Sequence, residues 1–387
     1  MRLVLAATFC CSFALSLVLV LVMHRLAPAL GLVDHPGGRK MHARPTPLGG
    51  GIAVLLAAGL PLLGAGVLAW VTRYNPASFT SSTVLQENIR LAAARFPLLL
   101  GILAGGLAFA ALGTWDDLKD LRPSTKLAGQ VLIALAVSLM PQVRISLFID
   151  SAVAQIAITT VWIVLLANCF NLLDNMDGQS GLMAFLTGGA LMVVAMQTGQ
   201  NFIAGMLMAL MGAVLGFLFF NLPPASIFMG DGGALFVGYM LAIATSLTSF
   251  MTVRQVNPLF PVLVPLVIFA VPLYDTLSVI AIRLHTGRPI MKADRNHFAH
   301  RLLRLGMSVR MVLLTMGLTV VATAAGATVP YGSSTWRVCV PALQAGAVVF
   351  VIILLELASA RPQGAALDEA SRPEQGADGP ADPKQGH

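Results

Sequence analysis

The chain has 387 residues, of which 57% are hydrophobic and only 11% are charged, and its formal net charge is +7 at pH 7. This content, in apolar runs of about 17 to 25 residues, excludes a soluble globular protein and predicts a polytopic membrane protein. The positive charge does not indicate nucleic-acid binding, because no basic stripe with interleaved aromatic residues accompanies it. We therefore expect membrane lipid, and no nucleic acid, among its partners.

The apolar segments predict about eleven transmembrane helices. In chain order their approximate extents are 3–27, 50–72, 96–114, 127–141, 152–168, 181–197, 202–220, 234–251, 259–282, 309–329 and 337–358. The first segment is longer than the apolar region of a signal peptide, so we expect it to be retained. Residues 143–150 alternate apolar and polar side chains, which is typical of a short strand. The fold class predicted is an all-α polytopic membrane domain over residues 1–360.

The distribution of Lys and Arg predicts the orientation of this domain. With the N-terminus outside, seventeen of these residues fall on one side of the membrane and seven on the other, and the richer side is assigned to the cytoplasm. The C-terminus is then cytoplasmic as well, and residues 361–387, rich in Pro, Gly, Ala and acidic residues, form a disordered tail. Five polar loops fall on the cytoplasmic face, at 34–51, 114–120, 168–181, 220–233 and 285–303.

Acidic side chains gather in these loops beside histidines and several Lys and Arg residues. The acids are Asp116, Asp117, Asp120, Asp174, Asp177 and Asp231. Carboxylates beside surplus positive charge fit Mg²⁺ with phosphate groups, because Mg²⁺ fills its coordination shell with a few protein oxygens, phosphate oxygens and water. The pattern predicts an active site on the cytoplasmic face, where a cytosolic diphosphate meets a phosphate carried by the membrane.

The stretch NCFNLLDNMDG at 168–178 spaces its polar residues at intervals of three. They are Asn168, Asn171, Asp174 and Asp177. If the stretch is helical, they form one polar edge that can read a uridine or hold a metal-bound phosphate. Alternatively, Asn168 only caps the end of a helix.

Two further features concern the segments after residue 259. His297 and His300 lie at i and i+3, but no third ligand follows at a spacing typical of zinc. Asp275 lies within an apolar segment, so we expect it to face the interior of the bundle, either supporting the site or contacting the substrate.

Four segments together resemble the signatures of the polyprenyl-phosphate N-acetylhexosamine-1-phosphate transferases. They are DDLKD at 116–120, NCFNLLDNMDG at 168–178, FNLPPASIFMGDGG at 220–233 and ADRNHFAHRLLRLG at 293–306. The resemblance implies transfer of a sugar 1-phosphate from a UDP-amino sugar to undecaprenyl phosphate, with UMP as second product and Mg²⁺ or Mn²⁺ as cofactor. It also implies a multi-pass protein of the bacterial inner (plasma) membrane, at the first membrane step of a cell-envelope polysaccharide pathway.

The resemblance also implies roles for individual residues. Asp231 and Asp117 are expected to bind the metal, and the catalytic set is Asp116, Asp117, Asp174 and Asp177. The expected substrate-binding residues are Asn171, Asn221, Phe228, His297, His300, Arg301 and Lys40. Phe228 resembles the aromatic residue that stacks on uracil, and Arg301 is either a phosphate clamp or an ordinary topogenic charge.

The chain departs from the family pattern at Asn175, at Gln179 with Ser180, and at Ala299. These changes leave the acids intact, so they bear on the sugar rather than the reaction. UDP-GlcNAc is the expected donor, and another UDP-N-acetylamino sugar is the alternative. A transporter is a further alternative, but the acids lie at the ends of cytoplasmic loops, which disfavours it. A non-catalytic scaffold is another, but the presence of Asp231 disfavours it. Helices rich in small residues, such as 101–113, allow a homodimer.

Overall fold

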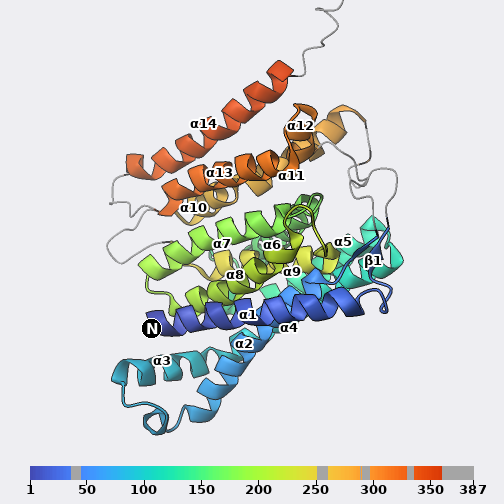
Figure 1. Ribbon diagram of the computed structural model, residues 1–387. Coiled ribbons are helices and arrows are strands. Elements are labelled where there is room, and N and C mark those ends of the chain that lie inside the picture. Colours follow the sequence, from blue (N-terminus) through green and yellow to red (C-terminus); the bar gives the residue numbers. More distant parts are fainter. Residues whose placement is uncertain (36–44, 251–259, 288, 290–296, 329–334, 360–387) are drawn as a thin grey trace, which may run out of the picture. The chain divides into compact units, whose positions relative to one another are not determined.

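The computed structural model describes residues 1–35, 45–250, 260–287, 289, 297–328 and 335–359 (Figure 1). Within these ranges the helices are joined by turns and loops, and the strands are two short antiparallel ones, β1 (Val33–Asp34) and β2 (Thr46–Pro47). The helices are α1 (Arg2–Leu26), α2 (Gly50–Thr72), α3 (Thr83–Ala94), α4 (Phe96–Lys119), α5 (Pro123–Ser138), α6 (Ala152–Leu173), α7 (Gln179–Gln197), α8 (Asn201–Asn221), α9 (Gly230–Leu247), α10 (Phe260–Ile268), α11 (Ala270–His285), α12 (Phe298–Arg304), α13 (Val309–Thr328) and α14 (Thr335–Ser359), with 3-10 turns η1 (Pro76–Ser78) and η2 (Pro141–Val143). The all-α class is confirmed.

The chain divides into two compact units, Met1–Val349 and Phe350–His387. The first unit holds both strands, the helices from α1 to α13 and most of α14. The described part of the second unit is the last turns of α14, and the predicted tail at 361–387 lies outside the described residues.

Eight helices of the described chain are long and apolar enough to cross a membrane, or nine if α10 and α11, bent by 79°, form one span. This number of apolar helices indicates an integral membrane protein, as the sequence predicts. Each of the eleven predicted segments corresponds to a helix or to the bent pair. However, α5 has only 16 residues and is too short to count among these helices, so the number of spans and their orientation stay predictions.

Helix α9 is the central helix of the first unit. It packs against α4 and α6, and its residues from Gly232 to Thr245 are all buried. A helix surrounded by other helices can be apolar on every side, which explains why its sequence has no polar face. In Figure 1 the helices of this unit run side by side, so their ends gather at the ends of the bundle.

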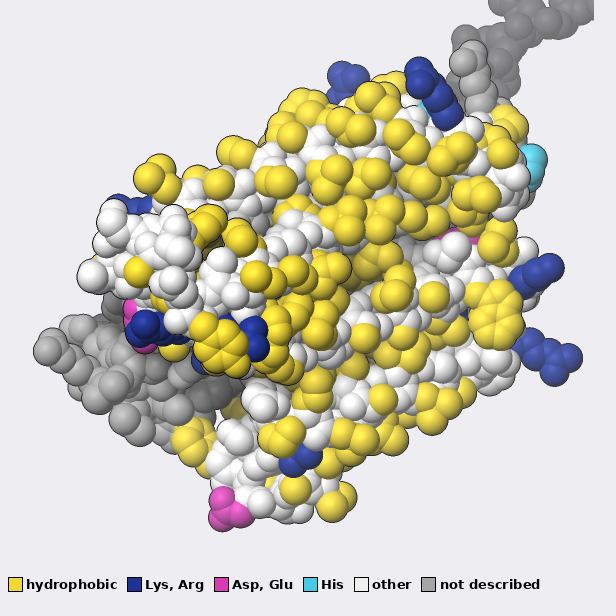
Figure 2. All heavy atoms as spheres, turned by 90° about the horizontal axis from the view of Figure 1, so that it is seen from below, with side chains coloured by type: hydrophobic (Ala, Val, Ile, Leu, Met, Phe, Trp, Pro, Cys, Tyr) yellow, Lys and Arg dark blue, Asp and Glu magenta, His cyan; other side chains and the backbone are white. Residues whose placement is uncertain are grey.

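Hydrophobic side chains cover much of the face seen in Figure 2, and few charged side chains interrupt them. Exposed residues such as Leu60, Leu107 and Leu132 contribute to the apolar surface of α2, α4 and α5. A lipid-facing surface has this composition, because hydrocarbon does not solvate charge.

Three local expectations differ from the structure. Residues 143–150 contain no strand, because Leu147 and Phe148 adopt positive φ angles in a turn. Helix α3 comes from a segment without a predicted element, because its twelve residues are too few and too polar to predict a span. Helix α6 continues to Leu173, five residues past the predicted end at 168.

The start of α2 holds the segment that leads into α9. The backbone N–H groups of Gly50 and Gly51 donate to the carbonyl oxygens of Phe228 (3.0 Å) and Met229 (2.9 Å). A Cβ atom on Gly51 would lie 2.3 Å from the backbone of Gly233, so the two helices are in backbone contact. This contact accounts for glycine at positions 51 and 233, and it fixes where α9 begins.

Candidate active site

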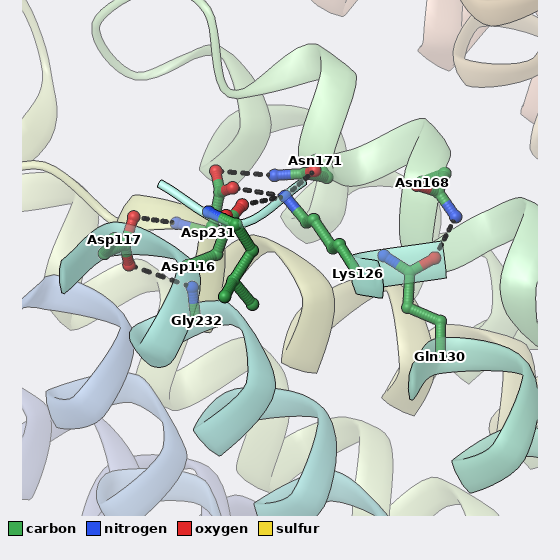
Figure 3. Close-up of polar contacts among 9 residues, drawn as sticks. Asp116, Asp117, Lys126, Gln130, Asn168, Asn171, Asp231 and Gly232 are labelled. Atoms are coloured by element: carbon green, nitrogen blue, oxygen red, sulfur yellow. Dashed lines mark hydrogen bonds and ion pairs between the residues drawn. The ribbon is translucent and has the colours of Figure 1, made fainter. Parts of the chain in front are cut away.

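The acids predicted from the sequence lie at neighbouring ends of several helices. Asp116 and Asp117 are in the last turn of α4, Asp174 directly follows α6, and Asp231 is in the first turn of α9. Figure 3 shows Asp116, Asp117 and Asp231 close together with Lys126 and Asn171. The structure therefore brings together residues that are up to 115 positions apart in the sequence.

Asp117 holds the beginning of α9. Its Oδ1 accepts a hydrogen bond from the backbone N–H of Asp231 (3.0 Å), and its Oδ2 accepts one from that of Gly232 (3.2 Å). The first N–H groups of a helix have no partner within the helix, and a carboxylate there also interacts favourably with the helix dipole. Gly230, which precedes them, has a φ of 72°, a conformation that favours glycine. Asp117 therefore fixes the position of Asp231.

Lys126, near the start of α5, lies at the centre of the cluster. Its Nζ donates to Asp116 Oδ2 (2.8 Å), to Asn171 Oδ1 (2.9 Å) and to Asp231 Oδ2. An ammonium group has three N–H donors, so all three are engaged. Three oxygen atoms from α4, α6 and α9 thus converge on one positive charge (Figure 3).

Asn171 and Asp116 each make one further hydrogen bond that fixes their orientation. Asn171 Nδ2 donates to Asp231 Oδ1 (2.8 Å), so its amide touches both Lys126 and Asp231. Asp116 Oδ1 accepts from the backbone N–H of Leu121 (2.8 Å), just after α4 ends. These second hydrogen bonds fix the Asn171 amide and the Asp116 carboxylate in the orientation in which an oxygen of each group faces Lys126.

One helical turn along α5 from Lys126, a second pair of polar side chains joins α5 to α6. Asn168 Nδ2 donates to the buried Gln130 Oε1 (2.6 Å) and to the carbonyl oxygen of Val164 (2.8 Å). Asn168 lies inside α6, so the alternative that it caps a helix end is wrong. The predicted polar edge does exist for Asn168 and Asn171, and it faces α5. It ends where α6 ends, at Leu173.

Asp174 and Asp177 lie in the turn between α6 and α7. Burial, followed by the neighbouring carboxylates of Asp231 and Asp117, raises the pKa of Asp174 well above its ordinary value. Asp174 therefore belongs to the same electrostatic cluster. Asp177 Oδ2 instead accepts from the backbone N–H of Ala225 (2.9 Å), in the loop before α9.

Asn221 is the last residue of α8, and Phe228 lies in the loop between α8 and α9. The buried Asn221 accepts from the backbone N–H of Gly178 (3.0 Å) and donates to the carbonyl oxygen of Ile227 (2.8 Å). Phe228 is half-buried, and its backbone N–H donates to the carbonyl oxygen of Pro47 (2.9 Å). The turn between α6 and α7 is thus tied to the end of α8, and the loop before α9 is tied to β2.

The histidine segment is anchored by Asp275, which is fully buried in α11 and so faces the interior as predicted. Asp275 Oδ2 lies 3.0 Å from His297 Nδ1, and its Oδ1 accepts from the backbone N–H of Phe298 (2.5 Å), the first residue of α12. Arg301 Nη2 donates to Ser278 Oγ (2.9 Å). His300 is half-buried, with its ring 6.5 Å from that of His297.

Sequence reasoning missed Lys126 and Gln130 as site residues. It treated Lys126 only as a topogenic charge, although the i, i+4 spacing of these two polar side chains on a short apolar helix was a usable signal. Lys40, predicted to bind substrate, lies outside the described residues.

A divalent cation fits the oxygen atoms that surround Lys126. Within the described ranges, no three His, Cys, Asp or Glu side chains gather in a way that would hold a metal ion by themselves. Two carboxylates and one amide oxygen do converge at Lys126, and Mg²⁺ accepts such oxygen ligands while leaving positions for phosphate and water. The arrangement is suited to a metal that arrives with a phosphate ligand.

Comparison with known proteins agrees with this chemistry. The model of glycosyl transferase family 4 matches residues 99–249, which include the whole cluster from Asp116 to Asp231. A probable undecaprenyl-phosphate N-acetylglucosaminyl 1-phosphate transferase of Bacillus subtilis (strain 168) is 28% identical over 320 residues, 81% of this chain and 81% of that protein. A decaprenyl-phosphate N-acetylglucosaminephosphotransferase of Mycolicibacterium smegmatis is 29% identical over 364 residues, 88% of this chain and 85% of the relative.

A third relative is the undecaprenyl-phosphate alpha-N-acetylglucosaminyl 1-phosphate transferase of Escherichia coli (strain K12), 26% identical over 319 residues, with 77% of each chain covered. These alignments span most of both proteins in every case. The central part of the chain thus matches glycosyl transferase family 4, and most of its length is similar to relatives named as polyprenyl-phosphate N-acetylglucosaminyl 1-phosphate transferases.

Proposed function

We propose that this protein transfers GlcNAc 1-phosphate from UDP-GlcNAc to undecaprenyl phosphate, giving undecaprenyl-diphospho-GlcNAc and UMP. The observation that carries the proposal is the convergence of Asp116, Asp231 and Asn171 on one cation position at the ends of membrane-spanning helices. The relatives are named for this transfer to undecaprenyl or decaprenyl phosphate. Another UDP-N-acetylamino sugar is the alternative donor.

In the reaction, an oxygen of the lipid phosphate forms a bond to the phosphorus that carries the sugar. The bond from that phosphorus to the oxygen bridging the two phosphates breaks, and UMP leaves with the electron pair. The lipid phosphate has a second pKa near 6, so it is mostly dianionic at neutral pH and needs little help from a base. Catalysis then depends on positioning and on neutralising negative charge.

Asp231, Asp116 and Asn171 are the residues that we propose hold Mg²⁺, with Mn²⁺ as the alternative. The metal supplies charge neutralisation for the diphosphate. Asp117 remains a candidate ligand, but both its oxygens already accept hydrogen bonds from the start of α9, so we rank Asp116 ahead of it. Asp174 stays in the proposed catalytic set; its raised pKa favours the protonated form, which can donate a hydrogen bond to a phosphate oxygen.

The remaining predicted residues are assigned to the nucleotide. Asp177 and Asn221 order the two loops beside Phe228, whose half-buried ring is our candidate for stacking on uracil. We assign His297, His300, Arg301 and Lys40 to the diphosphate, because these side chains can donate hydrogen bonds to phosphate oxygens.

We further propose that the protein spans the bacterial plasma membrane with its N-terminus outside and this site at the cytoplasmic face, where the nucleotide sugar is available. It would there supply the first lipid-linked sugar for a cell-envelope polysaccharide. A homodimer is the corresponding proposal for its assembly, but its contact is not formed by Gly105, Gly106 or Gly113 of α4, because these glycines are buried against α9.

The test is UMP release by the purified protein with undecaprenyl phosphate, Mg²⁺ and a panel of UDP-sugars, with and without EDTA. We expect UMP with UDP-GlcNAc only when lipid and metal are both present. Release from a different sugar would change the assigned donor. A folded sample that releases no UMP from any sugar would refute the transferase assignment and favour a scaffold.

A further inference from the structure

Lys126 occupies the position at which the oxygens of the site converge. Its ammonium group contacts Asp116 Oδ2, Asn171 Oδ1 and Asp231 Oδ2, which come from three different helices. Among the described residues, it is the one basic side chain in ion-pair contact with Asp116 or Asp231. The same atoms are those we propose as metal ligands, so this inference rests on the proposed function.

An ammonium group and a divalent cation cannot share this position. The ammonium uses all three of its N–H donors on the three oxygens, at ordinary hydrogen-bond distances of 2.8 and 2.9 Å for two of them. Mg²⁺ binds oxygen at about 2.0–2.1 Å, so the oxygens must turn from Lys126 to the metal. Two adjacent cations in a half-buried site would also repel each other unless further negative charge arrived with the metal.

We propose that Lys126 is a built-in substitute for the metal. In the free enzyme its ammonium keeps Asp116, Asp231 and Asn171 in a cation-binding arrangement and prevents the two carboxylates from repelling each other. When the diphosphate of the nucleotide sugar brings negative charge, Lys126 yields the oxygens to the metal. Metal binding is therefore coupled to nucleotide binding, and the metal alone binds weakly.

The surroundings of Lys126 allow this exchange without movement of the helices. One turn further along α5, Gln130 is held by Asn168 (2.6 Å), which fixes α5 against α6 independently of Lys126. Asp231 is held at its backbone by Asp117 (3.0 Å), and Asp116 by the N–H of Leu121 (2.8 Å). The long, flexible lysine side chain is thus the part of the cluster that is free to turn away.

The experiment measures Mn²⁺ binding by electron paramagnetic resonance on the full-length protein in detergent, with and without UDP-GlcNAc. The wild type is expected to bind Mn²⁺ weakly alone and at least about tenfold more tightly with the nucleotide sugar. Lys126→Met, which removes the charge and keeps the length, is expected to bind Mn²⁺ alone about tenfold more tightly than the wild type, and to lose most of the effect of the nucleotide. Lys126→Arg keeps the charge and should bind Mn²⁺ alone as weakly as the wild type does.

Lys119→Met is the matched control, because Lys119 is exposed at the end of α4 and its variant should behave as the wild type. If Lys126→Met does not fold, Lys126→Gln provides the same neutral test. A folded neutral variant that binds Mn²⁺ no more tightly than the wild type would overturn the inference. If the inference about Lys126 fails but the wild type releases UMP, the proposed function still stands. If the wild type releases no UMP, the proposed function is refuted, regardless of the result of the Mn²⁺-binding measurement.

Discussion

Replacing Asp117 by Asn should reduce stability as well as activity, because Asp117 caps α9. The variant keeps one acceptor oxygen but turns an NH₂ group toward the second backbone N–H, so either Asp231 or Gly232 loses its partner. A hydrogen bond to a charged group contributes about 1.5–3 kcal/mol, and a carboxylate at a helix N-terminus about 0.3–1 kcal/mol. For this half-buried side chain we expect a loss of about 2 kcal/mol.

That loss should lower the melting temperature by a few degrees, measured by tryptophan fluorescence of the detergent-solubilised protein. UMP release should fall at the same time, because Asp231 is no longer held in place. Asp120→Asn is the control, since Asp120 is exposed just beyond the same helix end and its replacement should change neither quantity. If Asp117→Asn melts like the wild type but loses activity and Mn²⁺ affinity together, then Asp117 is a metal ligand and our account of it as a cap is refuted.

Other substitutions test other parts of the site. Asp231→Asn should abolish UMP release, with a smaller effect on the melting temperature than Asp117→Asn; wild-type rates would contradict the metal assignment. Asp275→Asn should raise the KM for UDP-GlcNAc several-fold more than it lowers kcat, because it loosens His297 and the start of α12; an equal loss in kcat with an unchanged KM would contradict a role in nucleotide binding. Arg144→Ala, at the end of the bundle opposite to the site, should leave UMP release within about twofold of the wild type, and a large loss would contradict the predicted orientation.

The sequence was sufficient to predict the long apolar helices, though not α3, and to assign the candidate site residues to one end of the bundle. Apolar length identifies a helix independently of its neighbours, and polar residues beside an apolar segment mark its end. For this reason Asp116, Asp117, Asp174 and Asp231 could be assigned to one region without knowledge of any contact between them.

The pairing within that region could not be predicted in the same way. Which side chains meet depends on how each helix is rotated about its axis, and a shift of one residue turns a side chain by about 100°. The position of Lys126 between Asp116 and Asp231 depends on the rotation of α4, α5 and α9 together. The side-chain amide of Asn168, inside α6, donates a hydrogen bond to Gln130 on α5. The sequence of α6 alone does not reveal this partner, so it could not show that α6 continues past Asn168.

The backbone contact between Gly51 and Gly233 limits how this sequence can change over evolutionary time. Even a methyl group, the smallest side chain that a mutation can introduce, would overlap the opposite helix. A second substitution on the opposite helix cannot compensate, because the residues at 51 and 233 are both already glycine and neither can become smaller. Genes for this protein can therefore diverge at the exposed apolar surface, while the codons for Gly51 and Gly233 stay confined to glycine within the first turns of α2 and α9.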